Sequence, residues 1–300
     1  MLYAKPTAIT ALPVLCAGLA SFLSTASFAA PALPVAGQVT ADPGTSLWEA
    51  NAPVGAYGQP EWVKTRRFAN TRVHIQRDPW EIAVEQWWRG RLVEGEWSHR
   101  FQEEIEIGLP GRVQLDFYYD WTYDKVLKSD FLDYAAEIRF AFGDWNQIWG
   151  NPTLYFEYKW TDKDRGPDVI EPKLLFGGDI GKDVQWGVNF VFEAETAGEK
   201  TEEMQVTGGI SQALSRSFSV GLEAKYVHET VKGARSNPEH KFLLGPSIQW
   251  CPCENSHIDL VALAGFTEES PDVELWFVGG IEFGRGNSSR TPHAPVSGRR

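Results

Sequence analysis

The feature that most constrains this sequence is a period of two that recurs in segments of about ten residues. Between Val113 and Trp121 every odd position is apolar or aromatic, and the positions between them are Gln, Asp and Tyr. A helix would scatter such positions around its circumference, because its period is 3.6, whereas a strand places them on one face. The pattern occurs twelve times, at about 80–90, 97–107, 113–123, 132–142, 152–161, 169–180, 184–195, 204–214, 218–229, 240–250, 257–266 and 273–283. It predicts an all-β, antiparallel fold.

The connections between these segments alternate in kind. One set is mostly short, at 108–112, 181–183, 215–217 and 251–256, with a longer member at 143–151. The other set is polar and usually longer, at 92–96, 124–131, 162–168, 197–203, 230–239 and 267–272. Bacterial outer-membrane barrels combine short periplasmic turns with longer outer loops, and their strands have about this length. We therefore predict an up-and-down transmembrane β-barrel of about twelve strands over residues 61–283.

Alternation alone does not say which face meets lipid, because a secreted β-sandwich or jelly roll would bury the apolar face instead. Three observations favour the membrane. Twelve strands make a barrel too wide for side chains to fill, and a signal peptide precedes it. Tryptophans also lie mostly near strand ends, where the rings of an aromatic girdle meet the membrane interface. The predicted girdle is Trp80, Trp88, Trp97, Trp121, Trp160, Trp186 and Trp250, and we place Trp145 and Trp149 at the same boundary.

The two ends of the chain differ from its body. Lys5, an apolar stretch over 8–23 and the small residues Ser27 and Ala29 predict a secretory signal peptide at 1–29. Residues 30–60 lack any period and are expected to form a disordered leader, and 284–300 a disordered basic tail. The short apolar run from Val73 to Gln76 is either a periplasmic strand or a piece folded into the barrel mouth.

Charge gathers on the face opposite the apolar one, which in a membrane barrel is the lumen. The predicted pore-lining residues are Glu85, Arg100, Glu104, Glu106, Asp116, Asp120, Glu137, Arg139, Glu157, Lys159, Glu171, Lys173, Glu193, Glu223, Lys225 and Asp259. The excess of acids predicts a preference for cations, and the net charge of -12 excludes nucleic acid as a partner. Because acids and bases in the lumen can pair, we expect a narrow or gated pore, and a closed, non-conducting barrel is the alternative.

The sequence offers little that could carry catalysis. Ser98–His99 and Ser256–His257 are adjacent pairs, but neighbours on a strand point to opposite faces and cannot act together. Cys251 and Cys253 flank a proline, without a second pair of ligands for a metal, and are two thiols or a strained bridge. We therefore expect no enzyme activity, no metal and no cofactor.

Two stretches resemble known outer-membrane proteins. The last strand, VELWFVGGIEF (residues 273–283), resembles the C-terminal targeting strand of bacterial outer-membrane barrels, although most of those end at the final Phe. The stretch FQEEIEIGLPGRVQLDF (residues 101–117) resembles the first hairpin of porin-like barrels and of barrels of the phenol-degradation MetA-pathway group. This resemblance, over residues 61–283, implies a channel or transporter for small solutes in the bacterial outer membrane, inserted by the assembly machinery, and it transfers no site residues. A structural or adhesive barrel acting through its outer loops is the alternative.

Overall fold

The computed structural model describes residues 49–124 and 128–284. The predicted signal peptide, most of the predicted leader and nearly all of the predicted basic tail lie outside these residues. Among the described residues, no helix is long and apolar enough to cross a bilayer.

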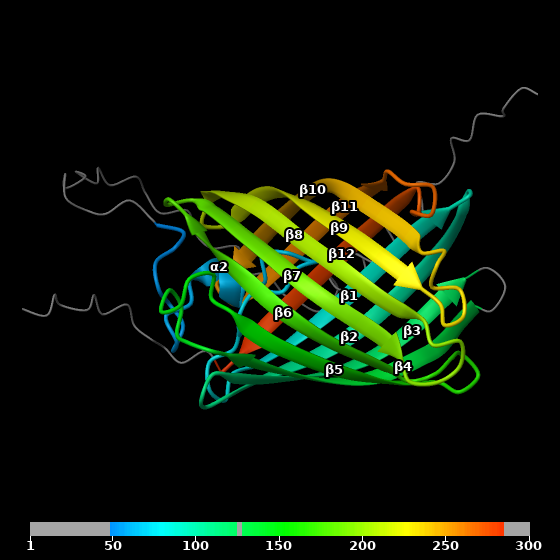
Figure 1. Ribbon diagram of the computed structural model, residues 1–300. Helices are drawn as coiled ribbons and strands as arrows, with labels where there is room; N and C mark the ends of the chain where they lie inside the picture. The colour runs from blue at the N-terminus through cyan, green and yellow to red at the C-terminus, as the bar shows by residue number, and fades with distance from the viewer. Residues whose placement is uncertain (1–48, 125–127, 285–300) are drawn as a thin grey trace, which may run out of the picture. The chain divides into compact units, whose positions relative to one another are not determined.

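Twelve antiparallel strands form one closed barrel (Figure 1). Each strand pairs with its neighbours in sequence, and the barrel closes where β1 pairs with β12, from Ile82 opposite Phe283 to Leu92 opposite Val273. The predicted number and order of strands are confirmed. The strands are β1 (Ile82–Val93), β2 (Glu96–Leu109), β3 (Val113–Asp124), β4 (Lys128–Ala141), β5 (Thr153–Thr161), β6 (Val169–Ile180), β7 (Val184–Glu195), β8 (Glu202–Ser215), β9 (Phe218–Thr230), β10 (Glu239–Cys253), β11 (Ser256–Gly265) and β12 (Val273–Phe283).

The two ends of the barrel differ in their connections. At the end that we call the turn end, β8–β9 and β10–β11 are joined by two residues each, while 142–152 makes a longer excursion between β4 and β5. The opposite, loop end carries 162–168, 231–238 and 266–272. The connection between β1 and β2 is shorter than predicted, because Glu94 and Gly95 both have positive φ (49° and 83°) and make a tight hairpin turn.

The outer and inner faces of the wall have opposite chemistry. On β5, Leu154 and Phe156 are exposed on the outside at 48% and 43%, while Tyr155 and Glu157 between them are buried. Charged residues of β1–β4 are likewise buried inside, and large apolar side chains cover the outside. A water-soluble barrel would have the reverse arrangement, so this is a transmembrane barrel of the outer-membrane type.

The predicted girdle tryptophans lie on the outer face, most of them near one end of the barrel, whereas Trp88 lies near the middle of β1. Trp160 is 49% and Trp250 51% exposed, and they occupy the loop end and the turn end of their strands. Trp149, in the connection 142–152, is 85% exposed and contacts Trp186. Trp145 differs from the prediction, because it is buried at 8% exposed and packs against Trp62.

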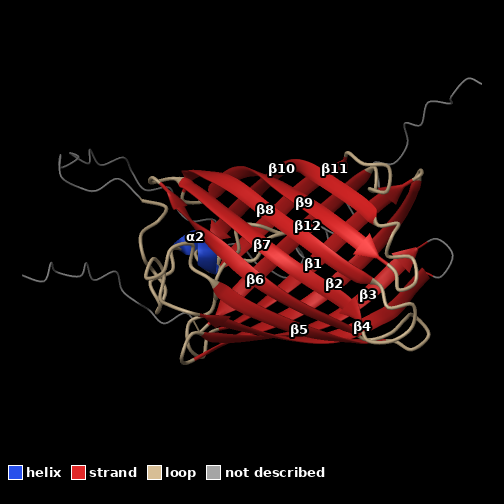
Figure 2. Cartoon of the chain, in the orientation of Figure 1, coloured by secondary structure: helices blue, strands red, loops and turns tan. Residues whose placement is uncertain are grey.

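Residues 49–58 are mostly half-buried or exposed, whereas residues 59–77, which also precede β1, fold into the turn end of the barrel (Figure 2). We call this segment the plug. It contains the four-residue helix α2 (Glu61–Lys64) and an irregular stretch that runs on to β1. The barrel was predicted to start at residue 61. In the structure the first strand starts at Ile82, and the chain from Trp62 to Arg77 is buried almost throughout. Of the two interpretations of Val73–Gln76, the piece folded into the barrel mouth is the one observed.

Candidate functional site: the plugged lumen

The plug carries a run of basic residues into an acidic lumen. Five bases and no acid occur between positions 64 and 77, namely Lys64, Arg66, Arg67, Arg72 and Arg77. None of them is more than 9% exposed. Because a buried charge is costly unless it is paired and hydrogen-bonded, each needs partners on the inner wall or within the plug.

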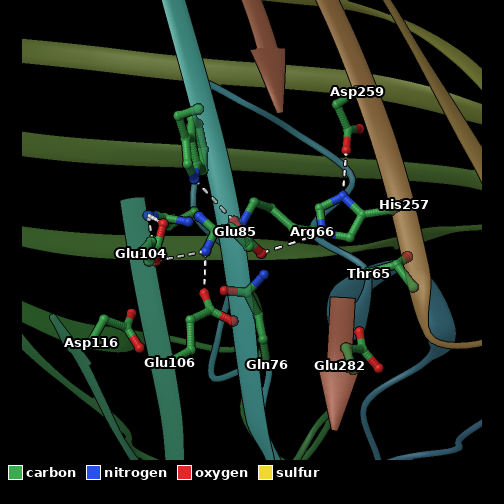
Figure 3. Close-up of polar contacts among 12 residues, drawn as sticks. Thr65, Arg66, Gln76, Glu85, Glu104, Glu106, Asp116, His257, Asp259 and Glu282 are labelled. Carbon is green, nitrogen blue, oxygen red and sulfur yellow. Dashed lines mark hydrogen bonds and ion pairs between the residues drawn. The ribbon is translucent and has the colours of Figure 1, made fainter. Parts of the chain in front are cut away.

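Arg66 lies at the centre of this arrangement (Figure 3). Its Nε is 2.8 Å from Glu85 Oε2 on β1, and its Nη2 is 2.9 Å from Glu104 Oε1 on β2 and also binds Glu106. We call these three glutamates, all 0–1% exposed, the acidic cluster. Their oxygens lie within 4.8 Å of one another, a spacing that also suits a metal ion. The guanidinium of Arg66 supplies the positive charge there, so the acidic cluster is a binding site for the plug.

Arg72 and Arg77 extend the contact to either side of Arg66. Arg77 Nε is 2.6 Å from Glu106 Oε2, and its Nη1 is 2.8 Å from Glu282 Oε1 on β12. Arg72 Nη2 is 3.1 Å from Glu104 Oε1. The guanidinium groups of Arg66 and Arg72 also lie 4.8 Å and 5.0 Å from the ring centroid of Trp87, an arrangement that favours a cation over an aromatic face. The plug is therefore tied to β1, β2 and β12 through charge.

Polar side chains of the wall satisfy the backbone of the plug. Asn189 of β7 accepts from Arg72 N at 2.8 Å and donates to Arg72 O at 2.7 Å. Glu223 of β9 accepts from Asn70 N at 2.8 Å, and Gln249 of β10 donates to Thr65 O at 2.7 Å. Buried backbone groups without secondary structure need such partners. Consequently an irregular segment can be held inside the barrel.

An apolar cluster closes the turn end. Trp62, Phe68 and Val73 of the plug pack together with Trp145, and Trp62 Nε1 donates to Asp179 Oδ1 at 2.8 Å. Two inward glycines let the plug approach the wall. A Cβ at Gly187 would lie 2.7 Å from Val73 Cγ2, and one at Gly209 would lie 2.5 Å from Phe68 Cδ1. A side chain at either position would collide with the plug.

His74 lies in the plug beside this cluster, outside the strands. It is fully buried, its ring packs edge-on against Trp145, and Nε2 lies 3.2 Å from the carbonyl oxygen of Gly143. Burial lowers the pKa of His74 to about 4, because an imidazolium there would lose its hydration. His74 is therefore neutral in the docked plug at neutral pH.

A cavity of about 310 Å³ occupies the lumen on the loop-end side of the plug. Plug residues Ala69, Asn70 and Arg72 line the side of the cavity that faces the turn end. Its walls carry Arg89, Arg91, Arg100 and Lys225 from β1, β2 and β9, and Lys159 and Lys173 with Glu157, Glu171, Glu193 and Glu203 from β5–β8. With Arg72, the lining has seven basic and four acidic side chains.

All sixteen predicted pore-lining residues lie on the inner face of the wall. Seven of them line the cavity: Arg100, Glu157, Lys159, Glu171, Lys173, Glu193 and Lys225. Five contact the plug: Glu85, Glu104, Glu106, Arg139 and Glu223. The other four form side-chain contacts within the wall: Asp116, Asp120, Glu137 and Asp259. That they line a conducting pore stays a prediction.

The adjacent Ser–His pairs do face opposite sides. His257 points into the lumen, with Nδ1 2.7 Å from Asp259 Oδ2 and Nε2 3.3 Å from Glu85 Oε1, whereas Ser256 Oγ lies 2.8 Å from Cys253 Sγ. Cys251 and Cys253 are free thiols, which decides between the two open alternatives.

The role of the basic residues of the plug was not predicted from the sequence. The run from Lys64 to Arg77 directly precedes the acid-faced strands of a chain with a net charge of -12, and this contrast was the available signal.

No protein-family model and no curated protein matches this chain. Solved structures with a similar fold exist. The NanC porin is 11% identical, with a TM-score of 0.48, over 67% of this chain and 98% of that one. The KdgM porin in complex with disordered oligogalacturonate is 9% identical, with a TM-score of 0.46, over 68% and 98%. The outer membrane protein Omp33 of Acinetobacter baumannii is 10% identical, with a TM-score of 0.37, over 69% and 100%. The assignment of this chain as a closed twelve-stranded transmembrane barrel rests on its own strand register and surface.

Proposed function

We propose that this chain is a channel for small solutes in the bacterial outer membrane and that its own plug closes it at rest. The observation that carries the proposal is the docking of Arg66 on the acidic cluster, because it is a buried interaction made by ions, in contrast to the apolar cluster at the turn end. When the plug leaves the lumen, the guanidinium and the carboxylates regain their hydration, and this offsets much of the free energy lost with the ion pair. Exposed apolar surface gains no such compensation. On the loop-end side of the plug lies a polar cavity that is large enough for a small molecule.

The predicted cation preference rested on the excess of acids in the lumen. In the docked state the acidic cluster pairs with plug cations, so its charge is not offered to a passing solute. The charge that a solute meets is then that of the cavity lining, in which bases outnumber acids. We also propose that β12, ending at Phe283, is the strand that the assembly machinery recognises.

A disulfide between plug and wall tests whether the plug is the gate. Thr71 Oγ1 in the plug lies 3.1 Å from Thr207 Oγ1 on β8, so Thr71→Cys with Thr207→Cys places two sulfurs within bonding reach. Cys251 and Cys253 are replaced by Ser to leave a single pair. In planar bilayers we expect discrete openings after reduction and none after oxidation, with the single variant Thr71→Cys unaffected by oxidant.

Two results would count against this proposal. Openings that persist in the oxidised pair would show that solutes pass without movement of the plug. A complete lack of conductance in both states would favour the second candidate, a non-conducting structural or adhesive barrel, for which the many buried contacts at the turn end also speak.

A further inference from the structure

Two cations face the cavity outside any ion pair of the described residues. Arg89 of β1 and Lys225 of β9 both line it, and neither side chain forms an ion pair or a hydrogen bond with another residue of the described chain. The other bases of the lining differ in this respect. Arg91 Nε, for example, is 2.5 Å from Glu274 Oε2, and Arg100 Nη2 is 2.8 Å from Asp120 Oδ2. Glu274 of β12 attracts both cations from beyond ion-pair distance, but the same carboxylate is already paired with Arg91. One carboxylate facing three cations leaves a surplus of positive charge, and a partly enclosed site with such a surplus attracts anions.

Further unused donors lie on the plug side of the cavity. Arg72 Nη1 and Asn70 Nδ2 are buried and have no hydrogen-bond partner within the described residues, and both residues line the cavity. Buried donors are normally satisfied. Both atoms are themselves enclosed, so the donors open to an acceptor are those of Arg89 and Lys225, with the side chains of Asn70 and Arg72 beside them.

An aromatic corner adjoins these cations. The guanidinium of Arg89 lies 5.4 Å from the ring centroid of Trp276, and Trp276 meets Trp87 edge-to-face at 6.0 Å. Both rings are fixed by their Nε1 atoms, which donate to Glu274 at 2.9 Å and to Glu85 at 3.1 Å. An apolar, flat part of a ligand can pack against such rings while its charged group reaches the cations.

The acids of the cavity lie mainly on β5–β8 and are largely occupied. Lys159 Nζ is 2.9 Å from Glu193 Oε2 and also binds Glu171, and Lys173 binds Glu171 as well. These lysines reduce the negative field of that wall. The rest of the lining, with Arg89 on β1 and Lys225 on β9, keeps a surplus of positive charge.

We propose that the cavity binds a small organic anion, with a carboxylate or phosphate between Arg89 and Lys225 and a flat apolar part against Trp276. As the solute of the channel this anion rests on the proposed function, whereas its binding does not. Because Asn70 and Arg72 belong to the plug, the bound anion also touches the gate.

Calorimetry on the folded, detergent-solubilised chain tests the proposal without conductance. The probes are benzoate, inorganic phosphate and benzylamine, a cation of similar shape to benzoate. We expect benzoate to bind at least about tenfold more tightly than benzylamine, a difference of about 1.4 kcal/mol. Benzoate should also bind more tightly than phosphate, because only benzoate has a flat face.

The paired variant Arg89→Gln with Lys225→Gln should weaken benzoate at least about tenfold. The matched control, Arg216→Gln with Lys232→Gln, removes the same charge from exposed positions in connections and should leave binding unchanged. Tighter binding of benzylamine than of benzoate, or equal affinity of the paired variant and the parent, would overturn the proposal. Equal affinities for phosphate and benzoate would exclude packing of the ligand against the tryptophan ring. Binding that is retained in a chain without conductance would overturn the channel and leave the anion site standing.

Discussion

The two halves of the lumen treat charge in opposite ways. At the turn end, Arg66 is fully enclosed, and each of its bonding nitrogens has a carboxylate partner from β1 or β2. At the loop end, Arg89 and Lys225 have no such partner and face a cavity. The same barrel wall therefore supplies a buried, ion-paired interface for a segment of its own chain and, in the cavity, a surface with two cations outside any ion pair. The difference indicates that the first half holds the plug and the second half is left for a ligand.

The largest effect is expected when Arg66, the central cation of the plug, is removed. Arg66→Met keeps most of the side-chain volume but leaves three buried carboxylates without their shared guanidinium. Breaking a buried ion pair in this way costs about 3–5 kcal/mol, so we expect the plug to leave the lumen for most of the time. Channel open probability in planar bilayers measures this directly.

The control for that variant is Arg165→Met, which removes an arginine of the loop-end connection 162–168 that pairs with Asp130, a 52% exposed residue of β4. Exposed pairs contribute little, so its open probability should match the parent. A closed Arg66→Met channel would show that the plug is held by its apolar cluster instead of by charge.

A medium effect is expected from pH through His74. Its pKa is about 4 in the docked plug and about 6.5 when the residue is exposed to water. Since the lower pKa belongs to the docked state, docking is fully stabilised above pH 6.5 and weakens as the pH falls from about 6.5 towards 4. Asp144 and Arg112, the charged groups that act on the ring, shift the pKa of His74 in opposite directions, and burial outweighs both.

Between pH 7 and pH 5 the protonation of His74 should favour the undocked plug by about 20-fold, or about 2 kcal/mol. His74→Asn, which tolerates the positive φ of 57° at this position, should lose that share of the pH response. Open probability at both pH values, in the parent and the variant, measures the difference. Identical pH responses would mean that other groups control the docking.

The smallest effect is expected from a change confined to the loop-end half. Arg91 is 36% exposed and pairs with Glu274, and it contacts the cavity but not the plug. We therefore expect Arg91→Gln to change the docking of the plug by less than about 1 kcal/mol, visible as an open probability within a few-fold of the parent. If Arg91→Gln opened the channel as fully as Arg66→Met, the two halves would not be independent.

Much of the wall could be predicted because it follows a local rule. Each strand alternates between lipid and lumen, so the apolar positions and the inward acids such as Glu104 and Glu106 follow from a period of two. Trp160 and Trp250 were predictable for the same reason, since they lie at the ends of apolar faces. The plug has no period. Its basic residues can be read from the sequence, but their binding inside the lumen cannot.

By itself the sequence determined a twelve-stranded barrel, the face that each strand turns inward and the surplus of acids on that face. Only the tertiary structure decided what neutralises those acids. Arg66 is nineteen residues from Glu85 and forty from Glu106, and it meets both because barrel closure brings β1 and β2 around the plug. Pairing between charges depends on distance in space, and an alternating pattern contains no information about which charge from another segment will enter the lumen. That is why the acidic lumen could be predicted while its occupant, and the basic cavity beside it, could not.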